Sequence, residues 1–213
     1  RSVDHSQQTF FTESFVDEIA HRAGKNPYQF RMELLQEHPR HRRVLEIAAE
    51  AAGYGNNLPE GHALGIAVQE SFGSVVAEVA EVSMGANNQP IVHKVTCAID
   101  CGRAINPDTV EQQVESGIIF GLTAALYGEI SIEKGRVAQN NFPDYEMVRM
   151  ATSPEIEVHI VESGEALGGL GEPATPPVAA AVTNAIYILT GQRVRELPIR
   201  KHDFSRSNSL ANV

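Results

Sequence analysis

Cysteine is scarce in this sequence of 213 residues, and tryptophan is absent. The two cysteines, Cys97 and Cys101, are too few for a disulfide framework or a tetrahedral zinc site. Cys101 is more typical of a small buried apolar residue than of a reactive thiol. The eight histidines show no metal-ligand spacing, and His93, within an apolar strand pattern, is more typical of a hydrogen-bonded core histidine. We therefore expect no metal ion held directly by protein side chains.

Long apolar runs and positive charge are also lacking. No apolar run is long enough to cross a bilayer, so the sequence predicts no membrane span. Lys and Arg number 17 against 27 Asp and Glu, a formal net charge of −10 at pH 7, and the acidic residues are spread along the chain. This balance disfavours binding to nucleic acid or to an anionic membrane surface. An initial methionine and a signal-peptide pattern are missing too. We expect a fragment whose own N-terminus lies upstream, and the compartment stays open.

The sequence does carry a change of hydrophobic period near residue 61. Residues 12–53 have helical spacing, with breaks at Gly24, Pro39 and Gly53, and the first helix is expected to begin at Thr12. From residue 62 the apolar residues alternate as in strands. Strands are expected over 64–68, 75–82, 91–99, 129–132 and 156–160, and further helices over 106–126 and 177–189.

This pattern predicts an α+β fold of mixed strands and helices, because helices and strands do not alternate regularly. We divide the chain into a helical segment over 1–61, an α+β portion over 62–204 and a tail over 205–213. In the first helix Phe15, Val16 and Ile19 share one side. Residues 72–74 are expected to kink the chain between two strands. Gly117 and Gly121, one helical turn apart, let another backbone approach closely.

The segment Gly168–Pro173 (GGLGEP) holds one carboxylate, Glu172. Its glycines permit positive φ and close approach to a ligand, and the helix start downstream offers unpaired N–H groups. A carboxylate on such a loop can serve as a general base. Taken alone, the pattern fits a tight turn with an exposed Glu172 better, since short motifs match by chance. A phosphate cradle is a further alternative, although the lysine of a P-loop is missing.

A second polar segment surrounds Gln113. Its amide both donates and accepts hydrogen bonds, which suits a large polar cofactor, and a surface amide on a helix is the alternative.

Taken in order, these segments resemble the xanthine oxidase family of molybdenum hydroxylases, most of all the isoquinoline 1-oxidoreductase beta-subunit type, which includes bacterial aldehyde dehydrogenase large subunits. The resemblance covers the chain up to about residue 199. The motifs that carry it are Arg1…Gln7, Asp100–Gly102…Asn106-Pro107, Gln113–Gly117 and Gly169–Pro173, with further local likeness over Glu70–Val79 and Pro154–His159.

The resemblance implies molybdenum bound to a molybdopterin, in bacteria often the cytosine dinucleotide form, and hydroxylation of an aldehyde or N-heteroaromatic substrate with oxygen from water. By residue-to-residue match, Glu172 is the general base, and Arg1, Gln113, Gly169 and Gly171 contact the cofactor. Val3 falls in the substrate pocket, where some relatives carry an aromatic residue, which disfavours a purine-like substrate.

The resemblance also implies partners. These are the rest of the large subunit, an electron-transfer subunit with iron–sulfur clusters or a cytochrome, and a small-molecule substrate. The isolated fragment is expected to be inactive and to hold no cofactor, because only part of the cradle is present. The alternative is a non-catalytic ligand-binding or interaction domain that retains the fold.

Overall fold

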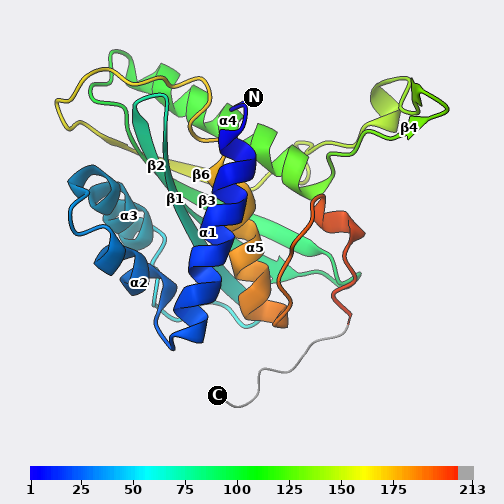
Figure 1. Cartoon of the computed structure of the whole chain (residues 1–213), viewed down its shortest axis with the longest axis horizontal. Helices are drawn as coiled ribbons and strands as arrows, with labels where there is room; N and C mark the ends of the chain where they lie inside the picture. Colours follow the sequence, from blue (N-terminus) through cyan, green and yellow to red (C-terminus); the bar gives the residue numbers. More distant parts are fainter. Residues whose placement is uncertain (206–213) are drawn as a thin grey trace.

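A four-stranded sheet with the order β1-β2-β3-β6 forms the centre of the computed structural model, which describes residues 1–205 (Figure 1). Three strands are antiparallel neighbours in chain order, and the last pairs in parallel with β3. The four strands are β1 (His62–Ser71), β2 (Ser74–Met84), β3 (Pro90–Asp100) and β6 (Glu155–Val161). Of the tail expected over 205–213, all but the first residue lies outside the described residues.

Helices cover both faces of this sheet (Figure 1). One face packs against α4 and α5, and the other packs mainly against α3, so apolar side chains from both faces of β2 are buried. The predicted α+β class is confirmed. The helices are α1 (His5–Arg22), α2 (Pro27–Leu34), α3 (Pro39–Ala51), α4 (Pro107–Leu126) and α5 (Pro177–Thr190), with 3-10 turns at Phe142–Asp144 and Ile199–Lys201.

The helix starts and stops have local causes. Asn106 caps α4 by accepting a hydrogen bond from Thr109 N, and Asn26 caps α2 in the same way from Tyr28 N. Gly191 ends α5 in the left-handed region at φ 69°. The predicted close approach at Gly121 is confirmed, since an added Cβ there would lie 2.6 Å from Thr175 O. Helices α1 and α3 pack directly on the sheet. The division of the chain into two parts at residue 61 stays a prediction.

Helix α1 differs most from its prediction. It begins at His5 instead of Thr12, and its apolar side points outward, with Phe15 59% and Ile19 38% exposed. The buried side carries Glu13 and Asp17 instead. The apolar spacing was therefore misleading about which side of this helix packs inward.

Three buried charges and the partly buried Arg193 explain the rotation of α1. Arg31 Nε donates to Glu13 Oε2 at 2.8 Å, and Arg193 Nη1 lies 2.7 Å from Asp17 Oδ2. The same Glu13 oxygen accepts a hydrogen bond from Val68 N at 2.9 Å. Buried carboxylates must be paired, so this cluster joins α1 to α2, β1 and the segment after α5.

Three smaller expectations are corrected. Residues 72–74 form a hairpin turn between β1 and β2, because Phe72 and Gly73 both have positive φ. The strand expected over 129–132 is reduced to β4 (Ile132–Glu133), paired with β5 (Arg136–Val137). His93 is hydrogen-bonded as expected, to Ser83 Oγ at 2.7 Å, but it is only half-buried.

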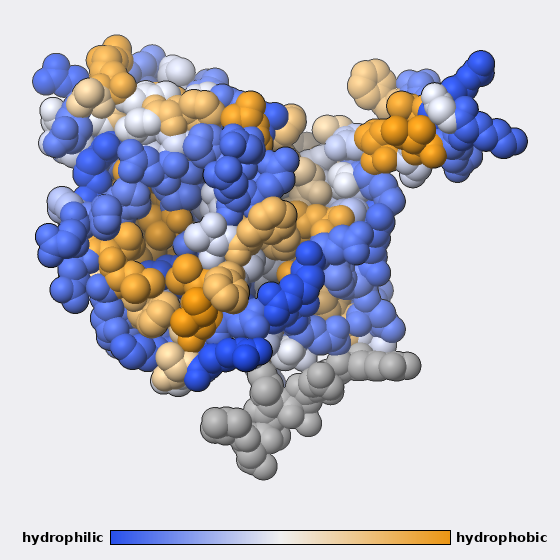
Figure 2. Space-filling view, in the orientation of Figure 1, coloured by the Kyte–Doolittle hydropathy of each residue, from blue (hydrophilic) through white to orange (hydrophobic). Residues whose placement is uncertain are grey.

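The β4–β5 hairpin projects from the body of the molecule and carries apolar surface (Figures 1 and 2). Within residues 1–205, none of the helices combines the length and apolar character that crossing a membrane requires.

Removing the Arg31 guanidinium tests the buried charge cluster. We expect Arg31→Met to lower the free energy of unfolding by about 3–5 kcal/mol, because it leaves Glu13 buried without its cationic partner. Lys25→Met is the matched control, since Lys25 pairs with Glu33 at the surface and such pairs contribute at most about 1 kcal/mol. Urea unfolding followed by circular dichroism measures both, and equal losses would contradict the assignment.

Glu78 on β2 offers a pH-dependent test. It is fully buried, and within the described part of the chain neither of its carboxylate oxygens has a hydrogen-bond partner. Burial raises the pKa of the Glu78 carboxyl well above its ordinary value of 4.5. The stability that its neutral form contributes is full below that ordinary value and is lost as the pH rises through the folded-state pKa.

We therefore expect Glu78→Gln to change stability little at about pH 4 and to stabilise the protein increasingly toward about pH 8. Urea unfolding of both proteins across this range measures the difference. A difference that does not vary with pH would show that Glu78 is not neutral in the fold.

Candidate functional site

The loop between β6 and α5 carries Glu172 and lies against the ends of β1, β2 and β3. Gly168 N donates to Cys101 O at 3.0 Å, and Gly169 N donates to Phe72 O at 2.8 Å. Ser74 Oγ in turn donates to Gly169 O at 2.7 Å. The loop is therefore tied to the sheet by its backbone before it reaches Glu172.

Gly168 and Gly169 of this loop serve close packing, not unusual backbone angles. Gly168, Gly169 and Gly171 are not among the glycines with positive φ, contrary to the expectation from the sequence. A Cβ at Gly168 would lie 2.2 Å from Ser74 Oγ and 2.7 Å from the Gly73 carbonyl carbon. At Gly171, in contrast, a Cβ would meet no atom within 4 Å. This part of the loop therefore faces open space.

Glu172 is half-buried and is held from two sides by Ser2. Ser2 N donates to Glu172 Oε1 at 2.6 Å, and Ser2 Oγ donates to Glu172 O at 2.7 Å. The next residue is also held, because Gln69 Nε2 donates to Pro173 O at 2.8 Å. The carboxylate thus has a defined position, unlike that of a freely exposed turn residue.

Arg1 joins three distant segments of the chain beside Glu172. Its Nε donates to Gly171 O at 2.7 Å, its Nη1 to Ser116 Oγ at 3.0 Å and its Nη2 to Gln113 Oε1 at 3.4 Å. The guanidinium also lies over the Phe120 ring, 5.6 Å from its centre. The structure therefore brings together four of the residues selected from the sequence, namely Arg1, Gln113, Gly171 and Glu172.

The other two selected residues lie at the edges of this group. Both backbone polar atoms of Gly169 are used within the chain, so its position supports the loop. Val3 is 67% exposed and lines a cavity beside the group. Its contact with a substrate, like the cofactor contact of Gly169, stays a prediction.

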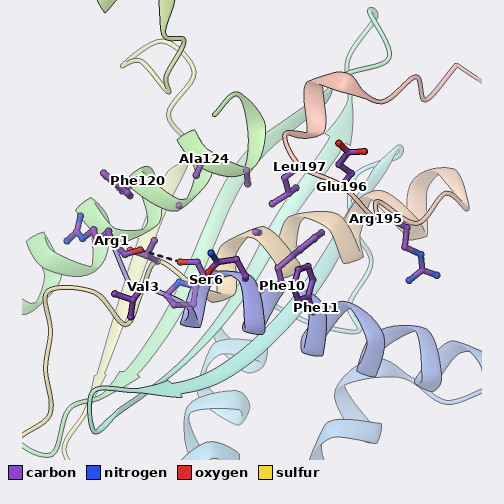
Figure 3. A pocket seen from close by; sticks show the side chains of 16 residues that line it. Arg1, Val3, Ser6, Phe10, Phe11, Phe120, Ala124, Arg195, Glu196 and Leu197 are labelled. Carbon is purple, nitrogen blue, oxygen red and sulfur yellow. Dashed lines mark hydrogen bonds between the residues drawn. The ribbon is translucent and has the colours of Figure 1, made fainter. Parts of the chain in front are cut away.

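The cavity that Val3 lines has a volume of about 640 Å³ and lies between α1, α4 and the start of α5 (Figure 3). Its wall is mostly apolar, and Arg1 is at one end while Arg195 and Glu196 are at the other (Figure 3). The apolar wall residues are Val3, Phe10, Phe11, Phe120, Ala124, Ala125, Pro176, Ala179 and Leu197. The cavity suits the apolar body of a small molecule better than a highly charged one.

Sequence reasoning missed two residues of this group, Ser2 and Ser116. In the structure the Ser116 hydroxyl is a partner of Arg1. Ser2 had no signal in the sequence, because its contacts depend on the fold. In the described part of the chain, no group of three or more His, Cys, Asp or Glu side chains is placed to hold a metal ion.

Comparison with known proteins gives a consistent result. Residues 20–154 match the sequence profile of the molybdopterin cofactor-binding domain. The chain is 36% identical to isoquinoline 1-oxidoreductase subunit beta of Brevundimonas diminuta, over 94% of this chain and 26% of that protein. It is 30% identical to a membrane-bound aldehyde dehydrogenase of Gluconacetobacter polyoxogenes named for pyrroloquinoline quinone, over 97% of this chain and 29% of that protein.

A solved structure supports the same fold. The aldehyde oxidoreductase of Desulfovibrio desulfuricans superimposes with a TM-score of 0.51 at 27% identity, over 59% of this chain and 14% of that chain. This chain spans between 26% and 29% of the length of the two curated relatives.

Two glycine substitutions test how the loop is packed. We expect Gly168→Ala to lower the free energy of unfolding by about 1–3 kcal/mol, because the new methyl group overlaps Ser74 Oγ and the hairpin backbone. Gly171→Ala is the matched control, and its stability should be unchanged or higher by up to about 1 kcal/mol, since the site is open. Thermal or urea unfolding measures both, and a reversed order would contradict this packing.

Proposed function

Because the chain belongs to the molybdopterin cofactor-binding domain family, we propose that it is the C-terminal portion of a molybdenum hydroxylase large subunit with Glu172 as the general base. The substrate would be an aldehyde or an N-heteroaromatic compound, hydroxylated with oxygen from water. The observation that carries this proposal is the placement of one oriented carboxylate, Glu172, beside the Arg1–Gln113 pair.

The residues present fit the proposed cofactor. A guanidinium and an amide suit a polar, phosphate-bearing group, and Arg1 and Gln113 supply them side by side. The open space at Gly171 allows a bulky group to approach the loop backbone. We extend the proposal to the cytosine dinucleotide form of molybdopterin, with Arg1, Gln113 and Gly171 in contact with it and Gly169 supporting them.

Glu172 would move the proton in this reaction. When bound, the cofactor supplies the two-electron oxidation and the activation of the oxygen that is transferred. Glu172 Oε1 is already engaged by Ser2 N, so the proton would be accepted by Oε2. A base that is held in its productive orientation before the substrate binds loses little conformational entropy during the reaction. Ser2 is therefore part of the proposed machinery.

The cavity beside Arg1 would hold the apolar part of the substrate, with Val3 in its wall. Val3 is small, which leaves room for an aliphatic or single-ring compound. It offers no aromatic ring for stacking, which disfavours a purine substrate. Electrons would leave through a partner subunit carrying iron–sulfur clusters or a cytochrome. The inactivity of the isolated chain stays a prediction. An aldehyde dehydrogenase relative is named for a quinone, so elemental analysis for molybdenum distinguishes the two cofactors.

The test of the proposal is Glu172→Gln in the cofactor-loaded enzyme. The amide is nearly the same size but accepts no proton at neutral pH, so turnover should fall by about a hundred- to ten-thousand-fold at unchanged molybdenum content. The reductive half-reaction rate and the metal content are measured together. Substrate affinity should change less than turnover, because the base acts mainly in the transition state.

The matched control is Glu165→Gln, an exposed carboxylate in the same loop. Its turnover should stay within about twofold of the wild type, as expected for a residue outside the chemistry. Turnover of Glu172→Gln within about threefold of the wild type, at full molybdenum content, would favour the non-catalytic alternative.

A further inference from the structure

Arg40 on α3 is far from Glu172 in the sequence but touches both structures that hold the Glu172 loop. Its Nε donates to Asp100 Oδ2 at 2.8 Å, and its Nη2 donates to Asp100 O at 3.1 Å. The same Nη2 also donates to Gly73 O at 3.2 Å. One guanidinium therefore joins the end of β3 to the turn between β1 and β2.

Asp100 also contacts the start of the loop, through its other carboxylate oxygen. Its side chain is 1% exposed, and its Oδ1 accepts hydrogen bonds from Gly102 N at 2.9 Å and from Ser163 Oγ at 2.8 Å. Burial alone would raise the pKa of this carboxyl, but the hydrogen bonds from Arg40, Gly102 and Ser163 together lower it below its ordinary value of 3.8. Asp100 is therefore held as a charged acceptor for both the helix and the loop.

The backbone completes the connection to Glu172. Gly164 N donates to Gly102 O at 3.1 Å, and Gly168 N donates to Cys101 O at 3.0 Å. The segment that follows Asp100 therefore holds the loop at two points. The hairpin turn that Arg40 contacts holds Gly169, through Phe72 O and Ser74 Oγ.

The hairpin turn itself needs support. Phe72 adopts φ 54°, a left-handed conformation that is uncommon for a bulky residue and costs on the order of 1–3 kcal/mol. Such a conformation persists only where the surroundings hold it. Two contacts supply this support, namely that of Arg40 with Gly73 O and that of Gly169 N with Phe72 O.

We propose that Arg40 and Asp100 are a positioning pair that fixes the loop carrying Glu172, so that helix α3 sets the placement of the proposed base. The proposal rests on the proposed function of Glu172 for its catalytic consequence, but not for its structural one. The planar fork of an arginine is required, because it spans a carboxylate and a separate backbone carbonyl at once. Lysine, a single point charge, can serve only one of them.

Hydrogen exchange of the 213-residue chain tests the structural part. The amides of Gly168 and Gly169 are the reporters, because both donate to the segments that Arg40 holds. In Arg40→Met they should exchange at least about tenfold faster, as expected for the loss of a charge-assisted hydrogen bond. Amides in the middle of β2 should change by less than about threefold. Arg40→Lys should restore the wild-type rates only in part.

Two further variants keep the test decisive. Arg43→Met is the matched control on the same helix, because Arg43 is exposed and pairs only with Glu46 in the described structure, and it should leave both reporters unchanged. Ser163→Ala removes the hydrogen bond from the loop to Asp100 and a longer one, 3.4 Å, that Ser163 Oγ accepts from Glu165 N. It should speed Gly168 exchange even if Arg40→Met fails to fold. Unchanged reporters in Arg40→Met and Ser163→Ala would overturn the proposal. Equal acceleration of all amides would overturn it too, since that is global destabilisation.

The catalytic consequence is measured on the cofactor-loaded enzyme. Arg40→Met should lower kcat by about tenfold or more with KM within about twofold, since misplacing a base affects the transition state more than substrate binding. An unchanged kcat would overturn the catalytic part. Wild-type turnover in Glu172→Gln would overturn the base role instead, and the exchange of Gly168 and Gly169 would still decide the positioning of the loop.

Discussion

Paired charges inside the protein determine where α1 lies, and the site depends on that placement. Glu13 and Asp17 are buried against Arg31 and Arg193, which come from other parts of the chain. A different rotation of α1 would remove Glu13 and Asp17 from the buried Arg31 guanidinium and leave that charge unpaired, which is costly. The helix therefore presents Phe11 and Phe15 outward, while Phe10 is buried. Its N-terminal end lies against the loop of Glu172, where Ser2 makes two hydrogen bonds.

The site is a meeting point of segments that the sheet holds in place. The residues before α1, the first half of α4 and the loop before α5 come together around the Arg1 guanidinium. The loop is in turn supported by the β1–β2 hairpin and by the end of β3. The loop that carries Glu172 is therefore held by core strands, and Ser2, before α1, orients the carboxylate itself. This is the arrangement that the proposed general base would require.

Much of the fold followed from local patterns. The capping residue Asn106, the proline after it and the apolar spacing predicted α4 closely, and Gly191 marked the end of α5. The alternating stretches predicted the central parts of β1, β2 and β3, and each strand extends beyond its predicted range at both ends. The apolar spacing of α1 did not reveal its buried side, because that side carries the paired charges of Glu13 and Asp17.

The sequence by itself determined the α+β class, the family and Glu172 as the candidate base, because caps, periodicity and the combination of motifs are properties of the chain itself. Only the tertiary structure decided that Ser2 holds Glu172, that Ser116 accepts from Arg1, and that the glycine at position 168 is needed for close packing. These contacts join residues more than ninety positions apart. No spacing in the sequence encodes them, since they exist only after the sheet and the buried charges have brought the segments together.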